Sequence, residues 1–426
     1  MVTNILIKCK TCNKIFRLRW QIGYKIAEVN ILCPKCNSKV KAILEEYKPP
    51  KLINAIMCNS DEVNQDGDYL VEVSTEFLTK KISTFTDRFA IENLISPFLR
   101  AINKDNFDKI GELLNYGYSI KHLSTHFESV INLYYNPNKQ YLKKILMSND
   151  NPYAIMCRNT FRKYDLATEL DYLVGSHHYL ISLIRNTFLS ETNNNINEIM
   201  KVIGDEFGRI GQKIIDFADD LNKNNLFYLI STKFSFLVSE ILDTFLNLVP
   251  IYMNIDLNDV DLETVGITTL DIEKMISIYK KCYEFLGSFV ILPIGLNNII
   301  ERNTCNLFHN GKEHEIYGFL ESISSKFNRY NDFLKEHEKF SHMFIGGLNN
   351  IIRNSEAHFD YYFNQLTQKI KFVNNHKGNI YEKEMYLVEF AVEVIKIYQK
   401  CVLIWEMSYQ LNKLFLISKG EKFSML

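Results

Sequence analysis

Proline is scarce in this sequence, and neither an unbalanced charge nor a long apolar run is present. Eight prolines among 426 residues leave room for long helices, because proline disrupts a helix interior. The formal net charge of -1 excludes a protein that binds nucleic acid through its overall charge. The longest apolar stretch, residues 285–296, is too short and too interrupted to span a bilayer, and we recognise no signal peptide. These absences predict a cytoplasmic protein without a membrane partner.

Four of the nine cysteines follow the spacing of a metal site. Cys9, Cys12, Cys33 and Cys36 form the pattern C-x2-C-x20-C-x2-C. A two-residue gap lets both thiolates of a pair face one ion, and four soft sulfur ligands favour Zn²⁺ in a structural site. The alternatives are an iron–sulfur site or a redox pair, which would require a single C-x-x-C in a βαβ setting. The other cysteines are expected to be free thiols in a reducing compartment, namely Cys58, Cys157, Cys282, Cys305 and Cys401.

The segment that carries the four spaced cysteines is basic. Residues 1–48 contain ten Lys and Arg against three Glu, which gives +7 and leaves -8 on the remaining chain. One interpretation of this charge asymmetry is that the basic segment binds an anionic partner. The other is that the lysines only keep a small module soluble. Between the cysteine pairs, residues 15–20 and 24–26 alternate as short strands do, which is typical of a zinc ribbon.

Apolar residues recur at helical spacing through most of the remaining chain. The C-terminal tail, residues 383–416, carries an apolar stripe that is expected to belong to the hydrophobic core or to a dimer interface. Residues 69–73 and 359–382 are instead rich in aromatic and β-branched residues, which predicts a strand and then a β-hairpin or meander. Residues 193–195 are three asparagines and predict a loop. The predicted long helices cover residues 180–188, 196–221, 227–248, 270–289, 316–337 and 383–416.

The length predicts several domains, because 426 residues exceed one ordinary hydrophobic core. The 46% hydrophobic and 23% charged residues are typical of a globular protein. We therefore predict a mainly α fold: a helical bundle with a small β insert, preceded by a small β zinc ribbon. The parts are a zinc ribbon, a connector with some strand, a small helical segment and a larger helical domain, at residues 1–48, 49–81, 82–150 and 151–426.

A short polar motif stands just before the predicted hairpin. Arg353 is followed directly by Asn354, and four residues separate Arg353 from His358. The bare pattern R-x(4–6)-H is expected about once by chance here, and the added Asn makes it roughly tenfold rarer. Histidine titrates near neutral pH and arginine presents a fixed fork to phosphate, so the pair suits RNA cleavage by the 2′-hydroxyl. On a helix, Asn354 and His358 share a face, where Asn can orient the imidazole or hold a phosphate.

This motif resembles the R-x(4–6)-H signature of HEPN ribonucleases, whose form often begins Arg-Asn. The resemblance implies an up-and-down helical bundle with the motif late in it, and in some members a small β element after the motif. It also implies metal-independent RNA cleavage at a composite site in a homodimer, with an acid from another helix. Many members are toxins or abortive-infection effectors in microbial defence, and a regulatory protein partner would fit that role. Arg353, Asn354 and His358 are then the expected catalytic residues.

A second occurrence of the pattern lies upstream. Arg302 and Asn303 are followed by His309, and the hexapeptide at residues 295–300 recurs at residues 347–352. The repeated hexapeptide reflects either a short internal duplication or a coincidence in a sequence rich in Asn and Ile. We favour the later motif as the catalytic one, because an offset of 52 residues is too small for two complete bundles.

Two other interpretations compete with a nuclease. Arg353 and His358 can form a structural pair in a helical bundle, with His358 capping the helix end. The chain would then be a non-catalytic scaffold whose ribbon binds nucleic acid or protein, or an inactive HEPN relative that binds nucleotides. The sequence contains no Gly-rich phosphate loop, H-E-x-x-H or G-x-S-x-G motif, which argues against those enzyme classes.

Overall fold

The chain forms two compact units in the computed structural model. The first, which we call the β unit, comprises Met1–Tyr118, Leu242–Lys280 and Asn349–Ile395. The second, the helical unit, comprises Ser119–Ile241, Lys281–Leu348 and Lys396–Leu426. The structure describes residues 2–23, 26–45, 51–53, 59–65, 67–84, 95–102, 138–148, 166–188, 190–252, 254, 257, 260–318, 333–334, 338–344, 348–358 and 360–424.

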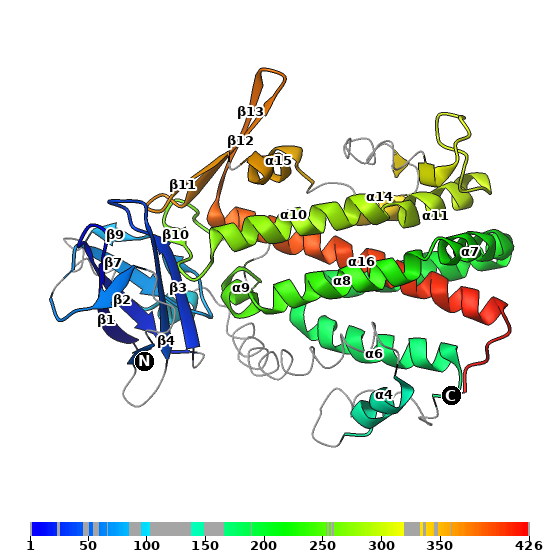
Figure 1. Cartoon of the computed structure of the whole chain (residues 1–426), viewed down its shortest axis with the longest axis horizontal. Helices are drawn as coiled ribbons and strands as arrows, with labels where there is room; N and C mark the ends of the chain where they lie inside the picture. The colour runs from blue at the N-terminus through cyan, green and yellow to red at the C-terminus, as the bar shows by residue number, and fades with distance from the viewer. Residues whose placement is uncertain are drawn as a thin grey trace. The chain divides into compact units, whose positions relative to one another are not determined.

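Two sheets built mainly from the N-terminal residues lie in the β unit (Figure 1). The strand order is β6-β1-β2-β7-β9 in the first sheet and β3-β4-β5 in the second, and β2 and β7 run parallel. The strands predicted at 15–20 and 69–73 are confirmed, and the segment predicted as connector adds strands to both sheets. The bounds are β1 Val2–Cys9, β2 Ile15–Gln21, β3 Ile26–Leu32, β4 Lys39–Glu45, β5 Lys51–Ile53, β6 Ser60–Glu62, β7 Tyr69–Val73 and β9 Ser83–Thr84.

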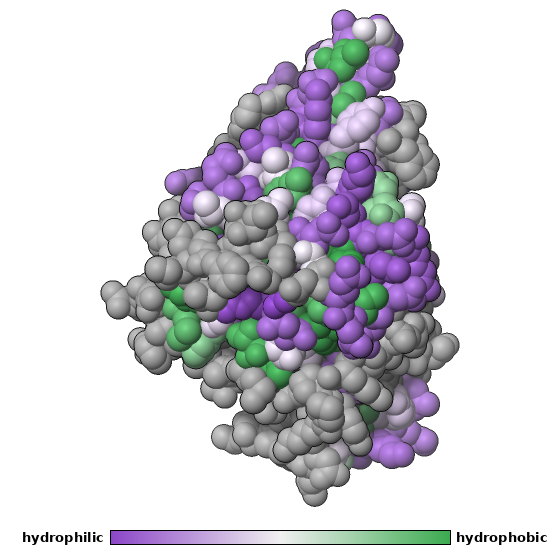
Figure 2. Space-filling view, turned by 90° about the vertical axis from the view of Figure 1, so that its left-hand side faces the viewer, coloured by the Kyte–Doolittle hydropathy of each residue, from purple (hydrophilic) through white to green (hydrophobic). Residues whose placement is uncertain are grey.

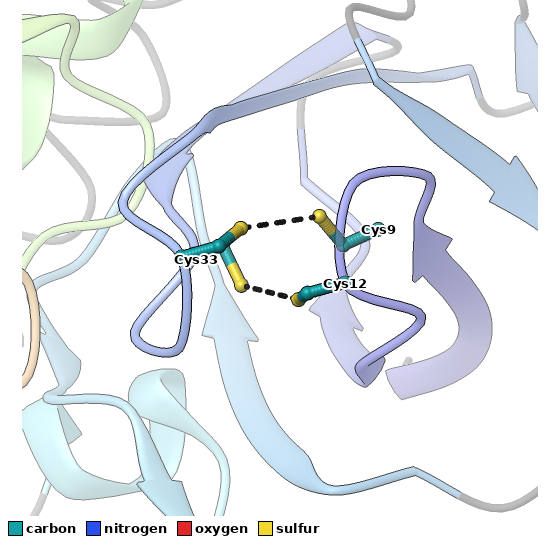
Figure 3. Close-up of side chains that lie close together, drawn as sticks. Cys9, Cys12 and Cys33 are labelled. Atoms are coloured by element: carbon teal, nitrogen blue, oxygen red, sulfur yellow. Dashed lines mark hydrogen bonds between the residues drawn. The ribbon is translucent and has the colours of Figure 1, made fainter.

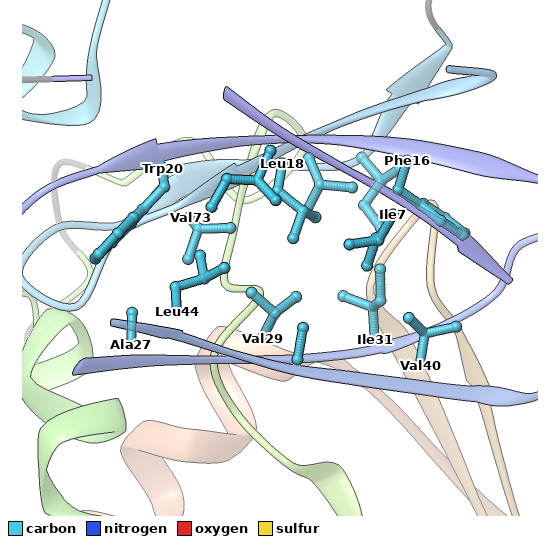
Figure 4. Packing of buried hydrophobic residues seen from close by; sticks show 14 of the residues in the cluster. Ile7, Phe16, Leu18, Trp20, Ala27, Val29, Ile31, Val40, Leu44 and Val73 are labelled. Atoms are coloured by element: carbon cyan, nitrogen blue, oxygen red, sulfur yellow. The ribbon is translucent and has the colours of Figure 1, made fainter. Parts of the chain in front are cut away.

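Alternating residues of the two sheets meet in one apolar core (Figure 4). On β2, Phe16, Leu18 and Trp20 are fully buried, whereas Arg17 and Arg19 point to the opposite face because side chains alternate along a strand. Burying each large apolar side chain contributes about 1.5–3 kcal/mol, so the period-two pattern fixes which face is inside. The opposing side chains from β3 and β4 include Ala27, Val29, Ile31, Val40 and Leu44.

A three-stranded antiparallel meander completes the β unit, as predicted for residues 359–382. Its third strand continues to Tyr386, so the tail helix begins at Leu387 and the predicted start at Lys383 is wrong. Lys383 and its neighbours pair with β12 in the ladder instead of starting the helix. The bounds are β11 Tyr361–Asn364, β12 Lys369–His376 and β13 Asn379–Tyr386, beside the short pair of β8 Thr79–Lys80 and β10 Val265–Gly266.

Helices predominate in the rest of the described chain. The predictions at 180–188, 196–221 and 270–289 are confirmed, and 227–248 is divided between two helices. The loop predicted at 193–195 is wrong: those residues lie in the first turns of a helix, and its buried stripe starts directly after them at Ile196. The bounds are α2 Pro97–Ile102, α4 Lys139–Leu146, α6 Glu169–Phe188, α7 Ser190–Lys223, α8 Leu226–Leu242, α9 Phe245–Tyr252, α10 Ile272–Phe289, α11 Ile291–Arg302, α14 Glu338–Phe344, α15 Asn350–His358 and α16 Leu387–Ser418.

Some predicted elements lie outside the described residues. The helical segment at 82–150 is described only in its short helices α2 and α4 and their flanks. Of the helix predicted at 316–337, residues 316–318 are helical and 319–332 are not described.

The core of the helical unit surrounds the C-terminal part of α16. Phe234 of α8 stacks on Trp405 and Tyr398, and it also approaches Phe285 of α10. On α6, the ring of His177 lies 4.5 Å from the ring of Trp405. The tail stripe therefore packs inside the chain's own core, and its residues Val388, Val392, Ile395, Val402 and Trp405 are all buried.

One helical stretch among the described residues, Ile272–Arg302, is long and apolar enough to cross a membrane. Of its apolar window, 83% is buried within the protein, which is usual for a core helix. The helices α8 and α9, which are bent by 79° relative to each other, pass the same test only if they are counted as one span.

Close packing of α11 on α7 gives a test of the helical unit. A Cβ at Gly295 would lie 2.3 Å from Cζ of Phe217, so Gly295→Ala is expected to destabilise the protein by about 1–3 kcal/mol. The matched control is Gly208→Ala on α7, where a Cβ meets nothing within 4 Å and Ala should add about 0.5–1 kcal/mol. Urea unfolding monitored by circular dichroism measures both, and equal stabilisation by the two variants would contradict the packing.

Candidate metal centre and motif helix

The first cysteine pair lies in a tight turn between β1 and β2. The amide of Cys9 donates to the carbonyl oxygen of Lys14 at 2.8 Å, and the amide of Asn13 donates to the carbonyl oxygen of Cys9 at 2.8 Å. Asn13, directly after Cys12, has a φ of 59°, a left-handed conformation that Asn tolerates better than most residues. The turn therefore brings the thiols of Cys9 and Cys12 to the same end of the hairpin.

The second pair repeats this geometry between β3 and β4. The amide of Cys33 donates to the carbonyl oxygen of Ser38 at 2.9 Å, and the amide of Asn37 donates to the carbonyl oxygen of Cys33 at 2.8 Å. Asn37 follows Cys36 with a φ of 57°. We call the two turns knuckle 1 and knuckle 2. Each belongs to a different sheet, so the pairs approach each other from the two layers that enclose the core.

The four sulfur atoms converge between the knuckles (Figure 3). All four lie within 4.8 Å of one another, with Cys9 Sγ 3.8 Å from Cys36 Sγ and Cys12 Sγ 3.5 Å from Cys33 Sγ. Tetrahedral ligands at about 2.3 Å from one ion would be separated by about 3.8 Å. The predicted ligands are thus brought together, in a group that can hold a metal ion.

Two polar residues that no sequence motif indicated surround the sulfur atoms. Ser38 Oγ lies 2.8 Å from Cys36 Sγ and 3.6 Å from Cys9 Sγ. Asn59 Nδ2 donates to Ser38 Oγ at 2.9 Å and to Thr11 Oγ1 at 2.7 Å. Hydrogen bonds of this kind orient metal ligands. Asn59 is 50 residues from Cys9, so no motif spacing could have revealed it.

The surroundings of the thiols shift their acidities in opposite directions. Hydrogen bonds from the side chain and backbone of Ser38 lower the pKa of Cys36 to about 6. Burial raises the pKa of Cys33 to about 12. Four adjacent sulfurs cannot all ionise without a compensating charge, and a bound cation supplies that charge.

Among the remaining cysteines in the described residues, Cys282 and Cys401 are buried and Cys305 is half-buried, all as free thiols. Cys58 and Cys157 lie outside the described residues.

The Arg-Asn-x-x-x-His motif occupies α15, which packs on β12 and β13. Asn349 caps the helix, because its Oδ1 accepts the amide of Ile351 at 2.8 Å. The guanidinium of Arg353 donates from NH1 to Asn354 Oδ1 at 2.9 Å, and both side chains are half-buried. His358 is the last residue of the helix, and its side chain lies outside the described part of the chain. The structure therefore brings Arg353 and Asn354 together.

The upstream motif has a local structural role. Arg302 ends α11, where its Nε donates to the carbonyl oxygen of Leu307 at 2.7 Å and NH2 donates to Asn298 Oδ1 at 2.7 Å. Asn303 closes the helix in a left-handed conformation, with a φ of 61°. His309 is exposed. Arg302 thus shapes the loop that follows α11.

The two copies of the hexapeptide have different structures. Residues 295–300 lie within α11 and all are buried. In the later copy, Asn349 precedes the helix as its cap, whereas the corresponding Asn297 is in a helix interior. The repeated sequence is therefore not a repeated structural element.

Comparison with protein-family models, with curated proteins and with solved structures gives no match for this chain.

Proposed function

We propose that this protein is a metal-independent endoribonuclease of the HEPN type, with a structural zinc ion in the four-cysteine centre. The observation that carries the proposal is the pairing of Arg353 with Asn354 on a helix whose last residue is His358. The hydrogen bond to Asn354 holds the guanidinium, and Arg is the side chain best suited to a phosphate. A half-buried arginine and a histidine five residues later on the same helix are the residue types that RNA cleavage requires.

In the proposed reaction the substrate is its own nucleophile. The 2′-hydroxyl oxygen attacks the adjacent phosphorus, the bond from phosphorus to the 5′-oxygen breaks, and a 2′,3′-cyclic phosphate and a 5′-hydroxyl result. His358 takes the proton from the 2′-hydroxyl or delivers one to the leaving oxygen. Arg353 stabilises the negative charge that develops on the phosphoryl oxygens. Asn354 positions Arg353, and by family resemblance two copies of the motif form a composite site in a homodimer.

The four-cysteine centre fits zinc in a structural role. Four thiolates in a compact group match the preference of Zn²⁺ for tetrahedral sulfur coordination, and they leave no open position for a substrate. The residues that would hold the ion are Cys9, Cys12, Cys33 and Cys36. The ion when bound would offset part of the negative charge of the thiolates and join the two sheets.

The biological setting that we propose is microbial antiviral defence or a toxin system in the cytoplasm, with a regulatory protein partner. It follows from the resemblance of the motif to a family in which such roles are common.

A second candidate is a non-catalytic scaffold that binds nucleic acid or protein. The charge of +7 on residues 1–48 favours it, because a basic module attracts an anionic partner without any catalysis. It differs from the nuclease in one respect that can be measured: loss of zinc would abolish its binding, whereas His358→Ala would have no effect.

Cleavage of total cellular RNA tests the nuclease. Wild type and His358→Ala are incubated briefly in EDTA, and 2′,3′-cyclic phosphate ends are counted. Removing a general acid or base costs about 10²–10⁴-fold in rate, so the variant is expected to give almost no cyclic ends. His309→Ala is the matched control and should cleave like wild type, since His309 is an exposed loop residue.

Equal products from wild type and His358→Ala would contradict the assignment of the site. Absence of cleavage by both, with folding verified by circular dichroism, would favour the scaffold.

A further inference from the structure

A groove of about 440 Å³ lies between knuckle 2 and the turn that joins β11 to β12. Pro34 and Asn37 line it from the knuckle. Tyr362, Lys369 and Lys371 line it from the sheet. The groove is thus formed by two parts of the β unit that are far apart in the sequence, and its lining includes an aromatic ring, two cations and one carboxylate.

The strand register places these side chains on one face. Tyr362 is opposite Lys371, and Asn364 is opposite Lys369, so the two rungs lie about 7 Å apart on the same surface of the sheet. Ile370, between the lysines, points the other way and is fully buried. Tyr362 is 69% exposed, which is unusual for a large aromatic ring in a sheet and leaves its face open to a planar ligand.

The two lysines are available to an anion. Lys371 Nζ lies 2.8 Å from Glu382, and Lys369 Nζ lies 3.8 Å from Glu384, but both pairs are exposed. Exposed pairs of this kind contribute little, so a phosphate can replace a carboxylate as the partner. Lys35, beside Pro34 on the knuckle, is also exposed.

Buried hydrogen bonds fix the wall of the groove. Gln365 Oε1 accepts the amide of Leu32 at 2.8 Å, which ties the turn to the end of β3. Gln368, which is buried, accepts the amide of Ile267 at 2.9 Å and donates to its carbonyl oxygen at 2.8 Å. The turn is therefore anchored at both of its ends, and little ordering remains to be done when a ligand binds.

We infer that this groove binds single-stranded RNA, with a base stacked on Tyr362 and the backbone phosphates on Lys369 and Lys371. The inference rests on the proposed nuclease function, whose substrate class it refines. Stacking on an exposed ring together with lysine contacts to the backbone is how sequence-tolerant single-strand sites work. The bases of a duplex are already stacked on one another and cannot cover Tyr362, so duplex RNA is expected to bind less well. Figure 2 shows hydrophilic side chains interspersed with a few hydrophobic ones over the β12–β13 hairpin.

Fluorescence anisotropy with a labelled 2′-O-methyl oligouridylate of about 12 nucleotides tests the groove on the full chain. The methyl group blocks attack by the 2′-oxygen, so binding is measured whether or not the protein is a nuclease. Tyr362→Ala and the double variant Lys369→Gln/Lys371→Gln are each expected to weaken binding about tenfold. Raising the salt from about 50 to 200 mM should weaken wild-type binding about tenfold as well. Matched controls outside the groove are Tyr381→Ala and Lys377→Gln on the same meander, which should bind like wild type.

Each outcome decides the inference. The inference is supported if only the groove variants lose binding and if duplex RNA competes poorly with the single strand. No binding by wild type, equal binding by all variants, or equal competition by duplex RNA overturns it. Groove-dependent binding without any RNA cleavage by wild type would retain the groove and reject the nuclease, so the two failures are distinguishable.

Discussion

Cys33→Ser is expected to lose the metal ion and to unfold the β unit. Knuckle 1 and knuckle 2 belong to different sheets, so an ion bound by both would also fix the two layers around their shared core. Structural zinc sites contribute about 10–16 kcal/mol of apparent binding free energy in small peptides, which is comparable to the whole stability of a domain, about 5–15 kcal/mol. The loss should appear as less than one zinc per chain by elemental analysis and as a lower midpoint in thermal unfolding.

The control for this experiment is Cys305→Ser, which makes the same chemical change at a half-buried thiol in the helical unit. It is expected to change the unfolding free energy by less than about 1 kcal/mol and to retain the zinc. Prolonged EDTA treatment of wild type, unlike the brief exposure in the cleavage assay, should reproduce the result of Cys33→Ser. A Cys33→Ser variant with full zinc content and unchanged melting would contradict the assignment of the ligand.

Glu406→Ala is expected to destabilise the helical unit by about 3–5 kcal/mol, the usual cost of leaving one member of a buried ion pair without its partner. His177 Nε2 lies 2.9 Å from Glu406 Oε2, and both side chains are buried. Gln410 donates to the other carboxylate oxygen at 2.7 Å, and the ring of Tyr409 stacks on His177 with 3.4 Å between centroids. Removing the carboxylate leaves the imidazole and the amide without an acceptor.

The exposed pair of Glu240 with Lys281 in the same unit provides the comparison. Glu240→Ala removes the same group from the surface and should cost less than about 1 kcal/mol. Chemical denaturation measured for both variants tests the difference, and equal costs would show that burial of the Glu406 pair is unimportant.

The same pair gives a pH dependence. Burial acts to raise the pKa of Glu406, but the charge and hydrogen bond of His177 and the bond from Gln410 outweigh it, so the pKa is lowered. The pKa of this carboxyl group in the unfolded chain is about 4.3. The stabilisation from Glu406 is therefore fully present above about pH 4.3, and it is lost as the pH falls through the lower pKa of the folded state. Glu406→Gln should flatten this part of the stability profile.

Local sequence patterns predicted the parts of the fold that depend on neighbouring residues. The two C-x2-C pairs indicated all four ligands, because a turn of fixed length determines where both thiols point. The alternation at residues 69–73 predicted β7 with the correct bounds. The loop predicted at residues 193–195 failed because three asparagines weigh heavily in local propensity, whereas burial of the stripe from Ile196 onward determines the helix.

Contacts between distant residues could not be predicted in this way. His177 and Glu406 are 229 residues apart, and neither stands in a recognisable motif. The same holds for the groove, where knuckle 2 meets a turn that the sequence indicated only as part of a hairpin. In α15 the sequence selected Arg353 and Asn354, but only the structure could show that their side chains bond to each other.

The order in which the chain is synthesised bears on how the β unit can form. The amide of Leu32 donates its hydrogen bond to Gln365, which is 333 residues away. At about 5–20 residues per second, roughly 17–67 s pass between the emergence of these two residues from a ribosome. Throughout that interval the end of β3 lacks its later partner, and β8 lacks its partner β10 until Gly266 is made, 187 residues after Thr79. The core of the two N-terminal sheets is made only of residues from Ile5 to Ile82 and can form early, so the step that must wait for the end of synthesis is the attachment of the β11–β12 turn to β3.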